Sequence, residues 1–286
     1  MFWLILAICS SIAFIQIIRW VQHDNGDLAF VGWVNYLFAA LFFFVPFILE
    51  HASVIAWPVF CLGLISGTIY VLNFFLLSVL IRLIGIGLVS ATASLAVIVP
   101  VVVSIALGDP WLDKAAGLLM TLIALPMVAM ARTQLGTKPS ASGIKRWIGV
   151  LVFFTAVGAE NTSIKLAREV GGQGFETFFL PALFVAAAIL ATVALLVRRS
   201  NPSPRGVACG LILGTCNIIS NYGMALAVQT LTGPVVFPVK LIGVVLGTTI
   251  LGRLLWRERL NWIGLIGIGL CIISTALLAM PEVVAW

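Results

Sequence analysis

The chain consists of long apolar runs separated by short polar breaks, and this pattern limits its fold more than any other feature. The runs cover residues 2–20, 29–49, 58–80, 84–107, 112–131, 147–166, 176–197, 206–228, 233–253 and 260–280. A helix needs about 20 apolar residues to cross the hydrocarbon layer of a membrane. Strands of a membrane barrel would instead show short segments of alternating hydrophobicity. We therefore expect an all-α integral membrane protein with ten transmembrane helices.

Composition agrees with this fold class. Hydrophobic residues make up 62% of the chain and charged residues only 9%, whereas soluble domains carry about 25% charged residues. The net charge of +6 does not indicate a nucleic-acid partner, because the basic residues are scattered over short polar breaks. All nine tryptophans lie at or near a predicted helix end, where amphipathic rings favour the headgroup region.

The cysteines show neither a disulfide spacing nor a metal-ligand spacing. All of them lie inside apolar runs: Cys9, Cys61, Cys209, Cys216 and Cys271. We expect them to be buried packing residues, and we expect no metal site and no bound cofactor.

The ten runs divide into two sets of five. The segment 132–146 resembles a linker, which gives one repeat over residues 1–136 and a second over residues 137–286. Gly63-Leu-Ile-Ser-Gly67 recurs as Gly210-Leu-Ile-Leu-Gly214, and small residues four apart let helix backbones approach closely. Further matches pair polar residues of the two sets at offsets of 146 to 149 residues: Arg19 with Lys165, Asn73 with Asn221 and Asp109 with Glu258. Because five is odd, the second repeat must be inverted in the membrane.

Lysine and arginine are distributed unevenly over the two sides of the membrane. The side with the loops after the first, third, fifth, seventh and ninth runs, here called the basic side, carries twelve of them, and the opposite side carries three. The positive-inside rule places the basic side in the cytoplasm and both termini outside.

Several motifs of the second half resemble the drug/metabolite transporter superfamily, in particular its ten-helix EamA-like members. They are Leu231-Thr-Gly-Pro-Val-Val-Phe-Pro238, Trp256-Arg-Glu-Arg-Leu260 and the glycine-rich Gly264 to Gly269. The resemblance implies two inverted five-helix units, and Glu258 matches the acidic residue that opens the final turn. The first half has Gly108-Asp-Pro-Trp111 in place of that turn. Family members often have both termini in the cytoplasm, so the resemblance and the charge count disagree on orientation.

Two charged residues lie well inside apolar runs, where they are expected to face protein or a watery cavity. Counted at 1.5 Å per residue, Glu160 and Lys240 both lie about 20 Å from the basic side. Asn217 and Asn221 lie at roughly 17 to 22 Å, Asn161 follows Glu160, and Tyr222 follows Asn221. We expect these six residues to bind a solute, with Lys240 as an anion ligand and Glu160 as its counter-charge or as a proton-coupling carboxylate. The alternative is an ion pair that only holds two helices together.

Other polar residues lie at a different depth, about 8 to 12 Å from the basic side. They are Gln16, Asn35, Tyr36, Tyr70 and Asn73. They could line a vestibule, or each could simply bond to a neighbouring helix. Lys165, at a run end, is expected to snorkel to the interface. Pro234 and Pro238 remove two amide donors, so we expect an irregular backbone before Lys240.

Together these features predict a secondary active transporter of a small solute, with an anionic or zwitterionic metabolite favoured, working by alternating access in the plasma (inner) membrane. Its partners would be the solute and membrane lipid. The alternative is a membrane-embedded enzyme acting on a lipid or isoprenoid substrate. The solute, the direction of transport and the coupling ion stay open.

Overall fold

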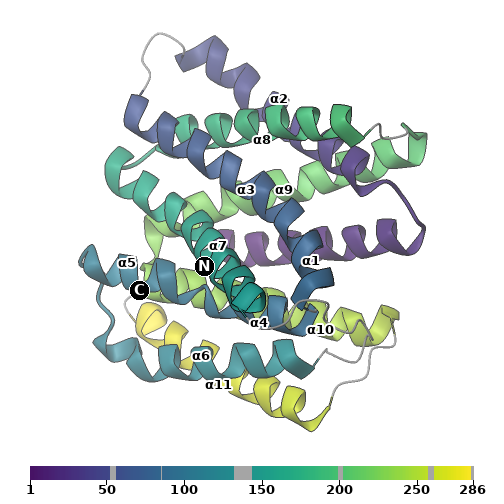
Figure 1. Cartoon of the computed structure of the whole chain (residues 1–286). Helices are drawn as coiled ribbons and strands as arrows, with labels where there is room; N and C mark the ends of the chain where they lie inside the picture. The colour runs from purple at the N-terminus through teal and green to yellow at the C-terminus, as the bar shows by residue number, and fades with distance from the viewer. Residues whose placement is uncertain (52–55, 85, 132–143, 199–201, 257–260, 285–286) are drawn as a thin grey trace. The chain divides into compact units, whose positions relative to one another are not determined.

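The structure is a computed structural model that describes residues 1–51, 56–84, 86–131, 144–198, 202–256 and 261–284. Its described elements are all helices, shown in Figure 1: α1 (Phe2–His23), α2 (Leu28–His51), α3 (Trp57–Ile84), α4 (Ile86–Leu95), α5 (Ile98–Ala106), η1 (Leu112–Lys114), α6 (Ala115–Ala131), α7 (Ile144–Gly171), α8 (Glu176–Arg198), α9 (Pro204–Thr230), α10 (Gly233–Trp256) and α11 (Trp262–Val284).

Within this described part, nine helical segments are long and apolar enough to cross a membrane. The tenth run corresponds to α11, whose apolar part Trp262–Leu278 is shorter. The chain is therefore an all-helical, multi-pass membrane protein, and each expected run coincides with a helical segment. Residues 132–143 of the expected linker and the turn that carries Glu258 lie outside the described residues, and residues 144–146 of that linker belong to α7 (Ile144–Gly171) instead.

The backbone irregularity lies in another span than expected. α10 is continuous although it contains Pro238, and Pro234 occupies its first turn, where an amide donor is not needed. The fourth run is instead divided into α4 and α5 by a turn at Ala96 and Val97. Pro100 accounts for this, because its ring lacks the amide that would bond to the Ala96 carbonyl and clashes with that carbonyl in a regular helix. Our expectation for residues 234–238 was wrong.

The helices form two compact units that each combine both halves of the sequence. Unit 1 contains Met1–Val71 and Leu166–Gln229, and unit 2 contains Leu72–Lys165 and Thr230–Trp286. This division into compact units does not test the predicted repeats, residues 1–136 and 137–286, because a repeat is defined by internal symmetry. The repeats stay a prediction.

Close helix contacts in unit 1 are made at the recurring glycines. A Cβ added at Gly67 of α3 would lie 2.0 Å from the carbonyl oxygen of Leu183 on α8. A Cβ added at Gly210 of α9 would lie 2.5 Å from Cβ of Val34 on α2. Both motifs thus do what the sequence predicts, since only glycine permits these approaches.

Unit 2 contains a similar close contact between α6 and α11. Gly117 lies against Leu278, and Gly267 lies against Val128. Between these two points the hydroxyls of Thr121 and Ser274 are 2.6 Å apart, and both are fully buried. Hydroxyl bonds of this kind join membrane helices without exposing polar groups to lipid.

The cysteines correct one expectation. Among the five free cysteines only Cys271 is buried, whereas Cys9 and Cys61 are exposed and Cys209 and Cys216 are half-buried. An apolar run in a membrane protein can turn a side chain toward lipid as well as toward protein, so position within a run does not imply burial.

Candidate functional site

Glu160 lies near the middle of α7 and is bonded by a neighbouring amide in unit 2. Nδ2 of Asn73, on α3, donates a hydrogen bond of 2.5 Å to Oε2 of Glu160. Asn73 is only 7% exposed, and its Oδ1 has no hydrogen-bond partner among the described residues. A buried acceptor without a donor is unfavourable. This amide therefore offers one occupied donor and one free acceptor beside a carboxylate.

Lys240 of α10 is the second charged residue of this group. It lies near enough to Glu160 for the two charges to act on each other. It makes no hydrogen bond or direct ion pair with any residue that the structure describes. Both side chains are half-buried. The equal depths derived from the sequence therefore correspond to two charges that lie near each other. They do not form the direct ion pair between helices that the sequence left open as the alternative.

Asn161 does not join this group, although it follows Glu160. Its Nδ2 donates to the carbonyl of Val157 on its own helix at 2.8 Å. The adjacent Thr162 and Ser163 also bond to carbonyls of α7. We call Asn73, Glu160 and Lys240 the charged cluster of unit 2.

The second polar group lies entirely in unit 1 and centres on Asn217 of α9. Oδ1 of Asn217 accepts bonds from the Tyr70 hydroxyl at 2.9 Å and from Nδ2 of Asn221 at 2.7 Å. Its Nδ2 donates to Oδ1 of Asn35 at 3.2 Å. Asn217 and Asn35 are each 2% exposed. We call these four residues the amide cluster of unit 1.

The amide cluster changes two groupings made from the sequence. Asn35 and Tyr70, assigned to a separate vestibule level, bond directly to Asn217, and Tyr36 packs edge-on against Tyr70 at 5.8 Å between ring centroids. Asn73, also assigned to the vestibule, belongs to the charged cluster instead. The error arose because helix rise gives a depth along one straight axis and takes no account of helix tilt.

The remaining two residues of the prediction lie elsewhere. Tyr222 is 39% exposed and packs against Trp3 and Phe43 rather than against the amides. Tyr222 therefore lies outside the amide cluster of unit 1. Gln16 is half-buried on α1.

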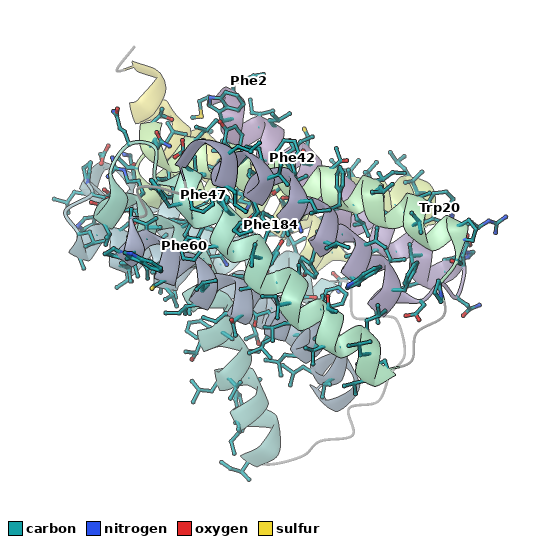
Figure 2. All side chains as sticks on the ribbon, turned by 90° about the horizontal axis from the view of Figure 1, so that it is seen from above. Phe2, Trp20, Phe42, Phe47, Phe60 and Phe184 are labelled. Carbon is teal, nitrogen blue, oxygen red and sulfur yellow. The ribbon has the colours of Figure 1, made fainter. Side chains whose placement is uncertain are left out.

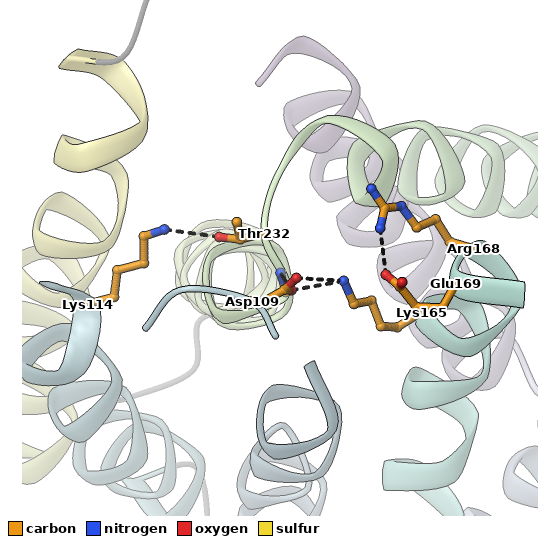
Figure 3. Close-up of polar contacts among 7 residues, drawn as sticks. Asp109, Lys114, Lys165, Arg168, Glu169 and Thr232 are labelled. Carbon is orange, nitrogen blue, oxygen red and sulfur yellow. Dashed lines mark hydrogen bonds and ion pairs between the residues drawn. The ribbon is translucent and has the colours of Figure 1, made fainter. Parts of the chain in front are cut away.

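Sequence reasoning missed a buried ion pair at one end of unit 2. Nζ of Lys165 lies 3.0 Å from Oδ1 and 2.9 Å from Oδ2 of Asp109 (Figure 3). Oδ2 of Asp109 also accepts the amide hydrogen of Gly233 at 2.7 Å, at the start of α10. Lys165 is 2% exposed, so the expectation that it snorkels to the interface was wrong.

A signal for this pair was present in the sequence. Lys165 ends one run and Asp109 follows another, both on the side opposite the basic side, and they carry opposite charges. Figure 3 shows a further lysine nearby, Lys114, whose Nζ donates to Oγ1 of Thr232 at 3.1 Å. The helix N-terminus at Gly233 favours the Asp109 carboxylate further, because its free amides carry partial positive charge.

Comparison with known proteins supports the fold and gives no activity. No family model matches the chain. An uncharacterized protein of Haemophilus influenzae is 26% identical over 280 residues, which cover 92% of this chain and 93% of that protein. A protein of known crystal structure has a similar fold, with a TM-score of 0.75 at 14% sequence identity and 96% of each chain covered.

Proposed function

We propose that this protein is a secondary active transporter of a small anionic or zwitterionic solute in the plasma (inner) membrane. In this proposal two inverted five-helix repeats, residues 1–136 and 137–286, alternate access to a binding site that includes the charged cluster of unit 2. The proposal also includes membership of the drug/metabolite transporter superfamily, on the motifs quoted above.

Matched contacts in unit 1 support the repeat. Gly63 and Gly67 of α3 lie against α8, and Gly210 and Gly214 of α9 lie against α2. α3 and α9 are the third helices of the two proposed repeats, and α2 and α8 are the second. The same contact therefore occurs twice with the repeats exchanged.

The contact between α6 and α11 in unit 2 also supports the repeat, because its matching residues are separated by a constant offset in the sequence. Gly117 lies against Leu278, while Gly267, 150 residues after Gly117, lies against Val128, 150 residues before Leu278. The contact is self-complementary, as expected of two copies related by a two-fold axis. α6 and α11 are also antiparallel in this contact, which agrees with repeats of opposite orientation.

The proposed function rests on one observation: Lys240 makes no hydrogen bond or direct ion pair with a described residue. An ionised group within a membrane helix is expensive and usually pairs with another group. Lys240 has a carboxylate near it, yet that carboxylate takes its hydrogen bond from Asn73 and not from the lysine. A lysine without a direct partner can bind an anionic group of a solute. The unpartnered Oδ1 of Asn73 can accept a hydrogen bond from the same solute.

Glu160 supplies the negative charge of the site. It balances Lys240 when no solute is bound, and it is the carboxylate that could carry a coupled proton. Proton-driven uptake into proteoliposomes tests this role. We expect the pH dependence of uptake to disappear in Glu160→Gln, and an unchanged pH dependence would remove the coupling role.

The transport function itself is tested with purified protein and a solute panel. We expect an organic acid or a zwitterion among amino acids, nucleotide sugars, organic acids and cationic dyes to raise the thermal unfolding temperature, and then to be taken up by proteoliposomes. Asn161→Ala serves as the matched control, because among the described residues that amide bonds only within α7. Covalent turnover of a lipid without solute uptake would instead favour a membrane-embedded enzyme.

A further inference from the structure

Unit 1 contains a cavity that the proposed transport site does not use. Its volume is about 710 Å³, and α1, α2, α8 and α9 contribute its walls. The residues that line it include five aromatic side chains and one carboxylate, which are Trp3, Phe42, Phe43, Phe47, Tyr222 and Glu176. No lysine, arginine or histidine occurs among the described residues that line it.

The rings form a connected aromatic wall. Trp3 and Tyr222 meet edge to face at 6.3 Å, and Tyr222 lies 6.4 Å from Phe43. Phe43 in turn stacks on Phe184 of α8 at 5.4 Å. Figure 2 shows Phe42 and Phe47 of α2 in the region of Phe184. Ring faces carry partial negative charge and attract organic cations.

Glu176 adds a full negative charge to this wall. It lies in the first turn of α8 and accepts a hydrogen bond from Nε2 of Gln229 at 2.7 Å. That partner is neutral, and no cation among the described residues pairs with the carboxylate. The helix N-terminus favours a negative charge at this position. The cavity therefore has a net negative charge within an apolar lining.

The cavity lies near three helix ends. Trp3 is near the start of α1, Glu176 is at the start of α8, and Tyr222 is about 12 Å from the end of α9. In the topology expected from the sequence these three helix ends share the side opposite the basic side. Amphiphilic molecules concentrate at this depth, with polar heads in the headgroup layer and apolar bodies below it.

We propose that this cavity binds an amphiphile with an ammonium head. The ammonium group lies between Glu176 and the aromatic wall, and the apolar body packs against Phe42, Phe47 and Pro181. The described lining offers no basic group for a phosphate, so only the ammonium part of a lipid headgroup would enter the cavity. The ligand could be a free amphiphile or a lipid with an ammonium head, and the two sources share this chemistry.

The test compares three probes that share an eight-carbon chain, on the full-length protein in nanodiscs of phosphatidylglycerol. We expect octyltrimethylammonium to bind and to raise the unfolding temperature, with 1-octanol and octyl sulfate at least about tenfold weaker. Equal binding of the three probes would overturn the proposal, because the cavity would then recognise only apolar surface. This comparison uses the wild-type protein and does not depend on any variant folding.

Variants locate the site. Glu176→Gln should weaken octyltrimethylammonium binding about tenfold, and Phe43→Leu should weaken it several-fold. Glu169→Gln is the matched control, since Glu169 pairs with Arg168 and does not line the cavity. Unchanged affinity in both lining variants would overturn the assignment to this cavity.

The two ligand sources are separated by lipid composition. If an ammonium lipid is the occupant, nanodiscs of phosphatidylethanolamine will weaken octyltrimethylammonium binding, and native mass spectrometry will show this lipid retained on wild-type protein but not on Glu176→Gln. If a free amphiphile is the occupant, the ratio of probe affinities between wild-type protein and Glu176→Gln will be the same in both lipids, because this ratio cancels the attraction of the probe to an anionic membrane surface.

Discussion

The two units solve the problem of polar groups in a membrane differently. In unit 1 the amide cluster is neutral, and Asn217 bonds to three neighbours. In unit 2 the charged cluster contains Lys240, which has no direct partner among the described residues, and Asn73, which has a free acceptor. A polar group that bonds within the protein needs no ligand, whereas one left without a partner is suited to bind one. This difference directs the search for the solute to unit 2.

Unit 2 also contains a fully partnered charge pair, and this pair gives the largest expected effect. Asp109→Asn or Lys165→Met leaves one buried charge unpaired, so each should destabilise the fold by about 3 to 5 kcal/mol. Unfolding of the purified protein in detergent measures this. Arg168→Gln breaks a more exposed pair and should change stability by less than about 1 kcal/mol. Equal losses in the buried and the exposed pair would contradict the assignment.

Helix packing provides a comparison that does not depend on charge. Gly67→Ala in unit 1 should destabilise by about 2 to 3 kcal/mol, because its Cβ would meet backbone atoms of Leu183. Gly117→Ala in unit 2 should have a smaller effect, because it meets the side chain of Leu278, which can move. Thermal unfolding of the two variants side by side tests this order. A larger loss in Gly117→Ala would show that these contacts are misplaced.

The next effect concerns the amide that holds Glu160. Asn73→Ala removes the donor to a carboxylate within the membrane, so we expect a loss of about 2 kcal/mol. Asn161→Ala, one residue after Glu160, should cost clearly less, because its amide bonds to its own helix at Val157 and to no other helix in the described part of the chain. Denaturant unfolding compares them, and equal losses would argue against a special role for Asn73.

The smallest effect is expected in the amide cluster. Asn217→Ala leaves Tyr70, Asn221 and Asn35 each without one partner, yet hydrogen bonds between membrane helices contribute about 0.6 kcal/mol on average. We expect a loss of about 1 kcal/mol and no loss of solute binding. Abolished binding in this variant would mean that unit 1 also contacts the solute.

The sequence predicted the helices well because a bilayer imposes length and hydropathy on every span. It predicted the contacts less well for a physical reason. Helix rise gave Glu160 and Lys240 a common depth, but depth does not specify the direction in which a side chain points around its helix. That direction explains why Asn73 bonds to Glu160 and Asn161 does not. It also explains why Cys9 is exposed while Cys271 is buried. The pair of Asp109 and Lys165 was missed because a lysine at a span end can also reach the interface.

The central claim is that Lys240 binds a solute and does not serve only to hold helices together. Its most direct test is the thermal stability of Lys240→Met, measured with and without the solute found in the panel, beside Lys165→Met. We predict that Lys240→Met is destabilised much less than Lys165→Met, because Lys240 makes no direct ion pair with a described residue, and that it loses the stabilisation by solute. A Lys240→Met protein that is destabilised as much as Lys165→Met and still responds to solute would contradict the account.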